Sequence, residues 1–142
     1  MPENRLIIEI LKQIDFAVNR VILSCENINI ANDFAISSDG MLRLESACML
    51  LSTIGESVKS LDKRTEGKLL NHYPSIEWKK IMGMRDIIVH HYFDIDIEIV
   101  FDVVKNKLPS LKLAIDEMIN DLTRLGVARD ALPSGAKMYK MD

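Results

Sequence analysis

The sequence predicts an all-α protein, a single domain of four to five helices packed as a bundle. Apolar residues recur at spacings of three and four over long stretches, which is the period of an amphipathic helix. With 142 residues, 48% of them hydrophobic, the chain can bury one sizeable core. Strand-like alternation occurs at Ile95, Ile97 and Ile99, where a lone strand would have no partner.

The first predicted helix runs from about Asn4 to Ile28. Its apolar face consists of Ile7, Ile10, Leu11, Ile14, Ala17, Val18, Val21 and Cys25. Residues 29–40 lose this period and gather cap and turn residues, so they predict a connection. Ser38 or Asp39 is the expected N-cap of the helix that follows.

The second predicted helix, from about Gly40 to Thr65, has the most regular apolar pattern. Its seam consists of Leu44, Ala47, Leu51, Ile54, Val58 and Leu61. These steps of three and four suit antiparallel packing in a bundle, or pairing across a two-fold axis. Gly55 interrupts the seam at a cost of about 1 kcal/mol relative to alanine, which suggests close approach of another backbone. A merely tolerated glycine is the alternative.

The third predicted helix follows a connection at residues 67–75. Ser75 is its expected N-cap, with Glu77 in the first turn, where the helix dipole favours an anion. Trp78 is the single tryptophan of the chain. We expect it to anchor the core, in preference to the alternative of a platform for base stacking.

A fourth helix is predicted at about residues 96–107, with Asp94 or Asp96 as its cap. Pro109 suits the first turn of a fifth helix, which Gly126 is expected to end. The apolar face of this fifth helix consists of Leu111, Ile115, Met118, Leu122 and Leu125.

The predicted domain comprises residues 1–126, and residues 127–142 are expected to form a tail that is mobile or contacts a partner. The sequence has neither the roughly 20 consecutive apolar residues of a membrane span nor the pattern of a signal peptide. Cys25 and Cys48 lack a zinc-type spacing, so we expect reduced, buried thiols, with a disulfide as the alternative. We therefore expect a cytoplasmic protein.

Charge is unevenly distributed along the chain, although the net charge of −3 gives no general argument for nucleic-acid binding. Residues 56–85 contain seven Lys or Arg against four acids, whereas residues 86–102 contain five acids and no Lys or Arg. A basic surface beside an acidic one suits phosphate on one side and a basic partner on the other. From charge alone, two ordinary solvated helix faces are the favoured alternative.

The candidate functional site lies within residues 75–97, where polar residues interrupt the apolar pattern. They are Arg85, Asp86, His90, His91 and Tyr92. A permanently charged guanidinium, an imidazole that titrates near neutrality and a phenol suit chemistry on a phosphate ester.

Helix geometry limits how these residues can meet. Asp86 and His90 are four residues apart and share a face, so Asp86 is expected to hold the His90 ring. Arg85 and Tyr92, seven apart, also share a face, but Arg85 and His90 diverge by about 140°. Either the helix ends or distorts near His90, or a second copy of the chain completes the site. We favour the second copy.

The residues favour metal-free cleavage of a phosphodiester. The sequence contains no His-Glu-x-x-His, no paired Cys-x-x-Cys, no Walker glycine loop and no Gly-x-Ser-x-Gly elbow, so we expect no metal site. His90 would act as general base on a ribose 2′-hydroxyl or as general acid on the leaving oxygen, and Arg85 would hold the phosphate. This chemistry implies RNA and not DNA. From these residues alone, a helix end with a structural histidine is an equal alternative.

Four motifs occur in order along most of the chain. They are Leu51-Ser-Thr-Ile-Gly-Glu-Ser-Val-Lys, Tyr73-Pro-Ser-Ile-Glu-Trp, Met84-Arg-Asp-Ile-Ile-Val-His-His-Tyr and Leu108-Pro-Ser-Leu. The third contains the spacing Arg85-x4-His90-x-Tyr92. With these motifs the sequence resembles the HEPN superfamily and, within it, the HepT-like toxins.

The resemblance implies an up-and-down helical bundle that forms a homodimer, with the Arg-x4-His motifs of both subunits lining one cleft. It implies a metal-independent endoribonuclease without a cofactor, the toxin of a type VII-like toxin–antitoxin system. Arg85 and His90 would be catalytic, with Asp86 as the supporting polar residue after the arginine. The cognate antitoxin would be a nucleotidyltransferase with an MNT domain, which transfers AMP to Tyr92. His91 would fill a variable position without a role.

A second functional class stays open, because some members of this family were regarded as substrate-binding subunits of two-component nucleotidyltransferases. In that case the cleft binds a small molecule or docks the MNT partner. Arg85 and His90 would then recognise a ligand without cleaving RNA.

Overall fold

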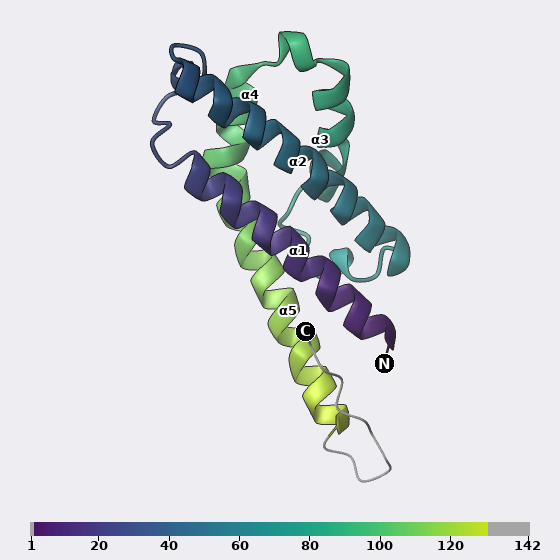
Figure 1. Ribbon diagram of the computed structural model, residues 1–142. Coiled ribbons are helices and arrows are strands. Elements are labelled where there is room, and N and C mark those ends of the chain that lie inside the picture. The colour runs from purple at the N-terminus through teal and green to yellow at the C-terminus, as the bar shows by residue number, and fades with distance from the viewer. Residues whose placement is uncertain (1, 131–142) are drawn as a thin grey trace.

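The computed structural model describes residues 2–130, and within that range every regular element is helical (Figure 1). The α-helices are α1 (Pro2–Ser24), α2 (Ser38–Arg64), α3 (Trp78–His90), α4 (Ile97–Asp102) and α5 (Leu108–Asp130). Short 3-10 turns lie at Ala31–Phe34, Leu70–His72 and Tyr92–Asp94, and a π-helical segment lies at Val103–Lys107. The predicted all-α class and the helical bundle are confirmed.

Helix α2 is central to the bundle. It packs against α1 on one side and α3 on the other, while α5 packs against α1 (Figure 1). Leu11, Leu51 and Ile115, from α1, α2 and α5, are each almost completely buried in one apolar core. Burial of such side chains contributes roughly 1.5–3 kcal/mol each, so this shared core fixes the three helices against one another.

The predicted seam of α2 is confirmed. Its members Ala47, Leu51, Ile54, Val58 and Leu61 are buried, and Leu44 is partly buried against the same core. The close approach predicted at Gly55 is also confirmed: a Cβ atom there would lie 2.8 Å from the carbonyl oxygen of Ile81 in α3. Glycine therefore allows α2 and α3 to cross closely.

Helix α1 ends earlier than predicted, at Ser24 and not at Ile28. The chain turns directly after it, with the N–H of Ile28 donating to the carbonyl oxygen of Cys25. The N-cap of α2 also differs from the prediction. Ser37 caps the helix, because its Oγ accepts the Gly40 N–H at 2.9 Å. The prediction of Ser38 or Asp39 was wrong by one or two residues.

Helix α3 begins at Trp78, so Ser75 is not its N-cap. Glu77 occupies the cap position, but its side chain makes no capping hydrogen bond. The Glu77 carboxylate instead lies 2.9 Å from Lys80 Nζ and 3.4 Å from Lys107 Nζ. The carboxylate therefore forms ion pairs with two lysines in place of a capping hydrogen bond.

Trp78 is buried, as the sequence predicted. Its indole Nε1–H donates to the carbonyl oxygen of Tyr73 at 2.9 Å, which satisfies the one polar group of the ring. Tyr73 Oη in turn donates to Asp121 of α5 at 3.0 Å. This chain of contacts ties the start of α3 to α5.

The fourth and fifth helices form one continuous helical run. Asp96 caps α4, as predicted, by accepting the Glu98 N–H at 2.9 Å. The π-helical segment leads directly into α5 and thus accommodates Pro109, which has no N–H for an i−4 bond. Helix α5 continues past Gly126 to Asp130, so the predicted end was wrong. Residues 131–142 of the predicted tail lie outside the described residues.

Cys25 and Cys48 are buried free thiols, as predicted. Burial raises the pKa of Cys48 to about 11, so its thiol stays protonated at neutral pH. Among the helices of residues 2–130, none combines the length and the apolar character needed to cross a membrane.

Candidate active site

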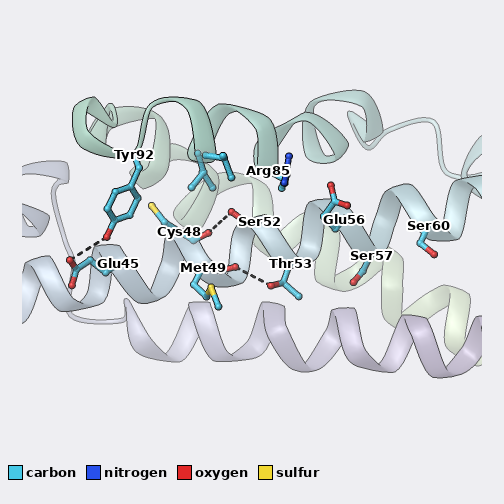
Figure 2. A pocket seen from close by; sticks show the side chains of 12 residues that line it. Glu45, Cys48, Met49, Ser52, Thr53, Glu56, Ser57, Ser60, Arg85 and Tyr92 are labelled. Carbon is cyan, nitrogen blue, oxygen red and sulfur yellow. Dashed lines mark hydrogen bonds between the residues drawn. The ribbon is translucent and has the colours of Figure 1, made fainter.

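A groove of about 710 Å³ runs between α2 and α3 (Figure 2). We call it the α2–α3 groove. Its lining residues are Glu45, Cys48, Met49, Ser52, Thr53, Glu56, Ser57, Ser60, Arg85, Ile88, Val89 and Tyr92. Two of the predicted site residues, Arg85 and Tyr92, therefore line one groove.

Arg85 is positioned by the close crossing of α2 and α3. A Cβ atom at Gly55 would lie 3.5 Å from the backbone N of Arg85, so the arginine starts directly over α2. Its Nη1 donates to Asp86 Oδ1 at 3.1 Å, and both side chains are about half exposed. An exposed ion pair of this kind contributes little to stability. The guanidinium can therefore leave it for a phosphate at small cost.

His90 is the last residue of α3 and is exposed. Its Nδ1 lies 2.8 Å from the backbone carbonyl oxygen of Asp86, one turn earlier. The prediction that the Asp86 side chain holds this ring was wrong: the backbone holds it, and the carboxylate pairs with Arg85. A carbonyl oxygen only accepts, so a neutral His90 carries its proton on Nδ1 and offers Nε2 as an acceptor.

The structure does not place His90 among the residues of the α2–α3 groove. Helix α3 ends at this residue, as one of the two predicted alternatives required. The helix end nevertheless leaves His90 outside the groove that Arg85 and Tyr92 line. One copy of the chain therefore does not gather all the predicted groups in one pocket.

Tyr92 lies in the 3-10 turn after α3 and is partly exposed. Its Oη donates to Glu45 Oε2 of α2 at 3.4 Å (Figure 2). The negative charge of Glu45 raises the pKa of the Tyr92 phenol, with a smaller contribution from desolvation. The ring meets the fully exposed Phe93 edge to face, with centroids 5.5 Å apart.

His91 points to a different part of the surface. Its Nδ1 lies 3.5 Å from Asp94 Oδ1, and the residue lines a separate apolar pocket between α3 and α4. Within the described part of the chain, no group of three His, Cys, Asp or Glu side chains is arranged to hold a metal ion.

Sequence reasoning missed Glu45 on the α2 side of the groove. The available signal was a polar face beside the apolar seam. Glu45, Ser52, Glu56 and Ser60 recur there at helical spacings. The sequence could not show that this face lies opposite Arg85 and Tyr92, because the pairing joins residues far apart in the chain.

Comparison with known proteins identifies the family of the chain. A family model described as "Ribonuclease HepT-like" matches residues 7–118. Over 72 residues the chain is 42% identical to "Putative RNase MJ0127" of Methanocaldococcus jannaschii, an alignment that covers 51% of this chain and 56% of that protein. Over 62 residues it is 37% identical to "Probable ribonuclease HepT" of Thermococcus cleftensis, with coverage of 44% and 53%.

The chain thus spans little more than half the length of these relatives. No solved structure matches it. The family model, however, covers the stretch from α1 to α5, and that stretch includes the groove and all the predicted site residues. The chain belongs to the HepT-like ribonuclease family.

Proposed function

We propose that this protein is a metal-independent endoribonuclease that cleaves RNA in the cytoplasm, with Arg85 and His90 as its catalytic residues. One observation carries the proposal: Arg85 lines the α2–α3 groove, and the same helix ends in His90, whose Nε2 is left as an acceptor. Membership of a ribonuclease family supports the choice of RNA.

In the proposed reaction, Nε2 of His90 accepts the proton of a ribose 2′-hydroxyl. The 2′-oxygen then bonds to the adjacent phosphorus, and the bond from phosphorus to the 5′-oxygen breaks. The leaving 5′-oxygen takes a proton from the protonated imidazole of a His90 side chain. Arg85 stabilises the negative charge that grows on the phosphate oxygens. The products are a 2′,3′-cyclic phosphate and a 5′-hydroxyl.

We further propose that the working enzyme is a homodimer. A homodimer would supply the imidazole that the groove of one chain lacks, because a partner's α3 packed over the groove would bring a second His90 toward Arg85. The exposed surface around the groove supports such pairing. Met49, Val89 and Phe93 are large apolar side chains with at least half of their surface exposed. Apolar side chains grouped in this way are typical of interaction surfaces.

The toxin–antitoxin role completes the proposal. In it, an MNT-domain nucleotidyltransferase acts as antitoxin and transfers AMP to Tyr92. The position of Tyr92 supports this inhibition, because the phenol lines the same groove as Arg85 and is partly exposed. An AMP group there would fill the groove and add a negative charge that repels RNA.

A non-catalytic subunit is the second candidate. The observation that favours it is the position of His90 outside the groove, which leaves Arg85 and Tyr92 in the groove without an imidazole beside them. In this case the groove binds a small molecule or docks the nucleotidyltransferase.

Expression without a partner gene separates the two. If the nuclease proposal is right, the wild type arrests bacterial growth and cuts cellular RNA, while a folded His90→Ala variant does neither. If neither protein arrests growth or cuts RNA, the result would favour the non-catalytic subunit. Circular dichroism confirms that the variant is folded.

A further inference from the structure

The hydrogen bond between Tyr92 and Glu45 joins two groups that the proposed RNA cleavage does not use. Tyr92 Oη donates to Glu45 Oε2 at 3.4 Å across 47 residues of sequence. Both residues lie at the same end of the groove, away from Arg85 (Figure 2). Gly55, which adjoins Arg85, lies ten residues along α2 from Glu45, about 15 Å by helical rise. The pair is therefore set apart from Arg85.

A protonated phenol is a weak nucleophile, so transfer of a group to tyrosine requires that the proton be removed. The charge of Glu45 raises the pKa of Tyr92, which makes a free phenolate scarce at neutral pH. The proton must therefore leave as the new bond forms. Glu45 is the carboxylate that the hydroxyl already contacts, and Tyr92 is exposed enough to meet a nucleotide.

We propose that Glu45 is the general base for AMP transfer to Tyr92. This inference rests on the proposed function, because it needs the nucleotidyltransferase to bind ATP and present it to Tyr92. In the reaction, Tyr92 Oη bonds to the α-phosphorus of ATP and its proton passes to the Glu45 carboxylate. The bond from the α-phosphorus to pyrophosphate breaks, and pyrophosphate leaves with the electron pair. Solvent then removes the proton from Glu45.

The test compares the wild type with Glu45→Gln and with the matched control Glu26→Gln. Glu26 is an exposed carboxylate in the turn after α1 and does not line the groove. Each full-length protein is incubated with the purified cognate MNT-domain nucleotidyltransferase and ATP. The initial rate of AMP attachment is followed by intact mass over about pH 6 to 9, and circular dichroism verifies folding.

At neutral pH we expect Glu45→Gln to be modified about 10²–10⁴-fold more slowly than the wild type, while Glu26→Gln keeps the wild-type rate. The ratio of wild-type to Glu45→Gln rates should fall as pH rises, because hydroxide replaces the missing base. This ratio cancels any pH dependence of the nucleotidyltransferase itself. Glu45→Asp, which keeps a carboxylate, should recover part of the rate.

Three results would overturn the proposal. A wild-type rate for Glu45→Gln would show that the carboxylate is not needed. A deficit that stays constant with pH would show that Glu45 positions Tyr92 or contacts the nucleotidyltransferase without accepting a proton. If the wild type itself takes up no AMP, the proposed modification of Tyr92 fails, and the role of Glu45 fails with it.

Discussion

The Nδ1 atom of His90 lies 2.8 Å from the backbone carbonyl oxygen of Asp86, so the last turn of α3 fixes the orientation of the imidazole. The contact assigns the Nδ1 proton in the neutral ring and leaves Nε2 for proton transfer. Helix geometry, and not a neighbouring carboxylate, thus orients the nitrogen atom that we propose for proton transfer.

A His90→Asn variant tests this arrangement. The asparagine amide can replace Nδ1–H as the donor to the Asp86 carbonyl, but it cannot transfer a proton near neutral pH. We expect normal folding and a loss of RNA cleavage of about 10²–10⁴-fold, measured with a defined RNA and the purified protein. Cleavage by His90→Asn at the wild-type rate would remove His90 from the catalytic residues.

The crossing of α2 and α3 provides a second prediction. A Cβ at Gly55 would meet the Ile81 carbonyl at 2.8 Å, which requires the backbones to separate. We expect Gly55→Ala to lower the free energy of unfolding by about 1–3 kcal/mol and to reduce RNA cleavage, because Arg85 moves with α3. Urea unfolding and cleavage rates measure the two effects.

Gly83 is the matched control for Gly55. It lies in the middle of α3, and a Cβ there would meet no atom within 4 Å. Gly83→Ala should therefore raise the free energy of unfolding by about 0.5–1 kcal/mol, since alanine restricts the unfolded chain. Equal effects of the two substitutions would contradict the special role of the Gly55 crossing.

The helical pattern was predictable because burial repeats with the period of the helix. The α2 seam follows from that pattern alone. At Gly55 the sequence left a close approach and a tolerated glycine as alternatives, and the contact with the Ile81 carbonyl decides for the close approach. Ser75 was predicted as the cap of α3, but Glu77 occupies the cap position and makes no capping hydrogen bond. Ser37 and Ser38 have the same side chain and therefore the same preference for the N-cap position of α2, and the backbone geometry decides between them.

The candidate residues were predictable to the extent that they lie close together in the sequence. Arg85, His90 and Tyr92 were proposed on their local spacing, and the structure places two of them, Arg85 and Tyr92, in one groove. The role of the Asp86 carboxylate was wrong, since residue spacing does not distinguish a backbone acceptor from a side-chain acceptor. Glu45 was missed because its contact with Tyr92 depends on how α2 and α3 pack.

The third prediction concerns pH and stability. Burial, followed by the hydrogen bond to Asp121, raises the pKa of Tyr73 to about 12. The pKa of Tyr73 in the folded protein lies above its unfolded value of 10.0. The contribution of the protonated Tyr73 hydroxyl to stability is therefore fully present below pH 10 and is lost as pH rises toward 12. Tyr73→Phe should lower the free energy of unfolding by about 0.5–1.5 kcal/mol at neutral pH.

Urea unfolding of wild type and Tyr73→Phe at several pH values checks this prediction. The difference between the two proteins should be constant through the neutral range and shrink above about pH 10. A difference that persists unchanged in strong alkali would mean that the Tyr73 hydroxyl contributes nothing through its link to Asp121.

The last prediction tests whether the active site is shared between two copies. Arg85 lines the groove of its own chain, whereas His90 of the same chain lies outside it. If a site combines Arg85 of one copy with His90 of the other, a mixed dimer of Arg85→Ala and His90→Asn retains one intact site. Each variant alone has none. Mixing equal amounts of the two inactive proteins, after dissociation and reassociation, should therefore restore about a quarter of the wild-type cleavage rate by random pairing. If both groups act within one copy, every site in the mixture lacks one of them and no activity returns.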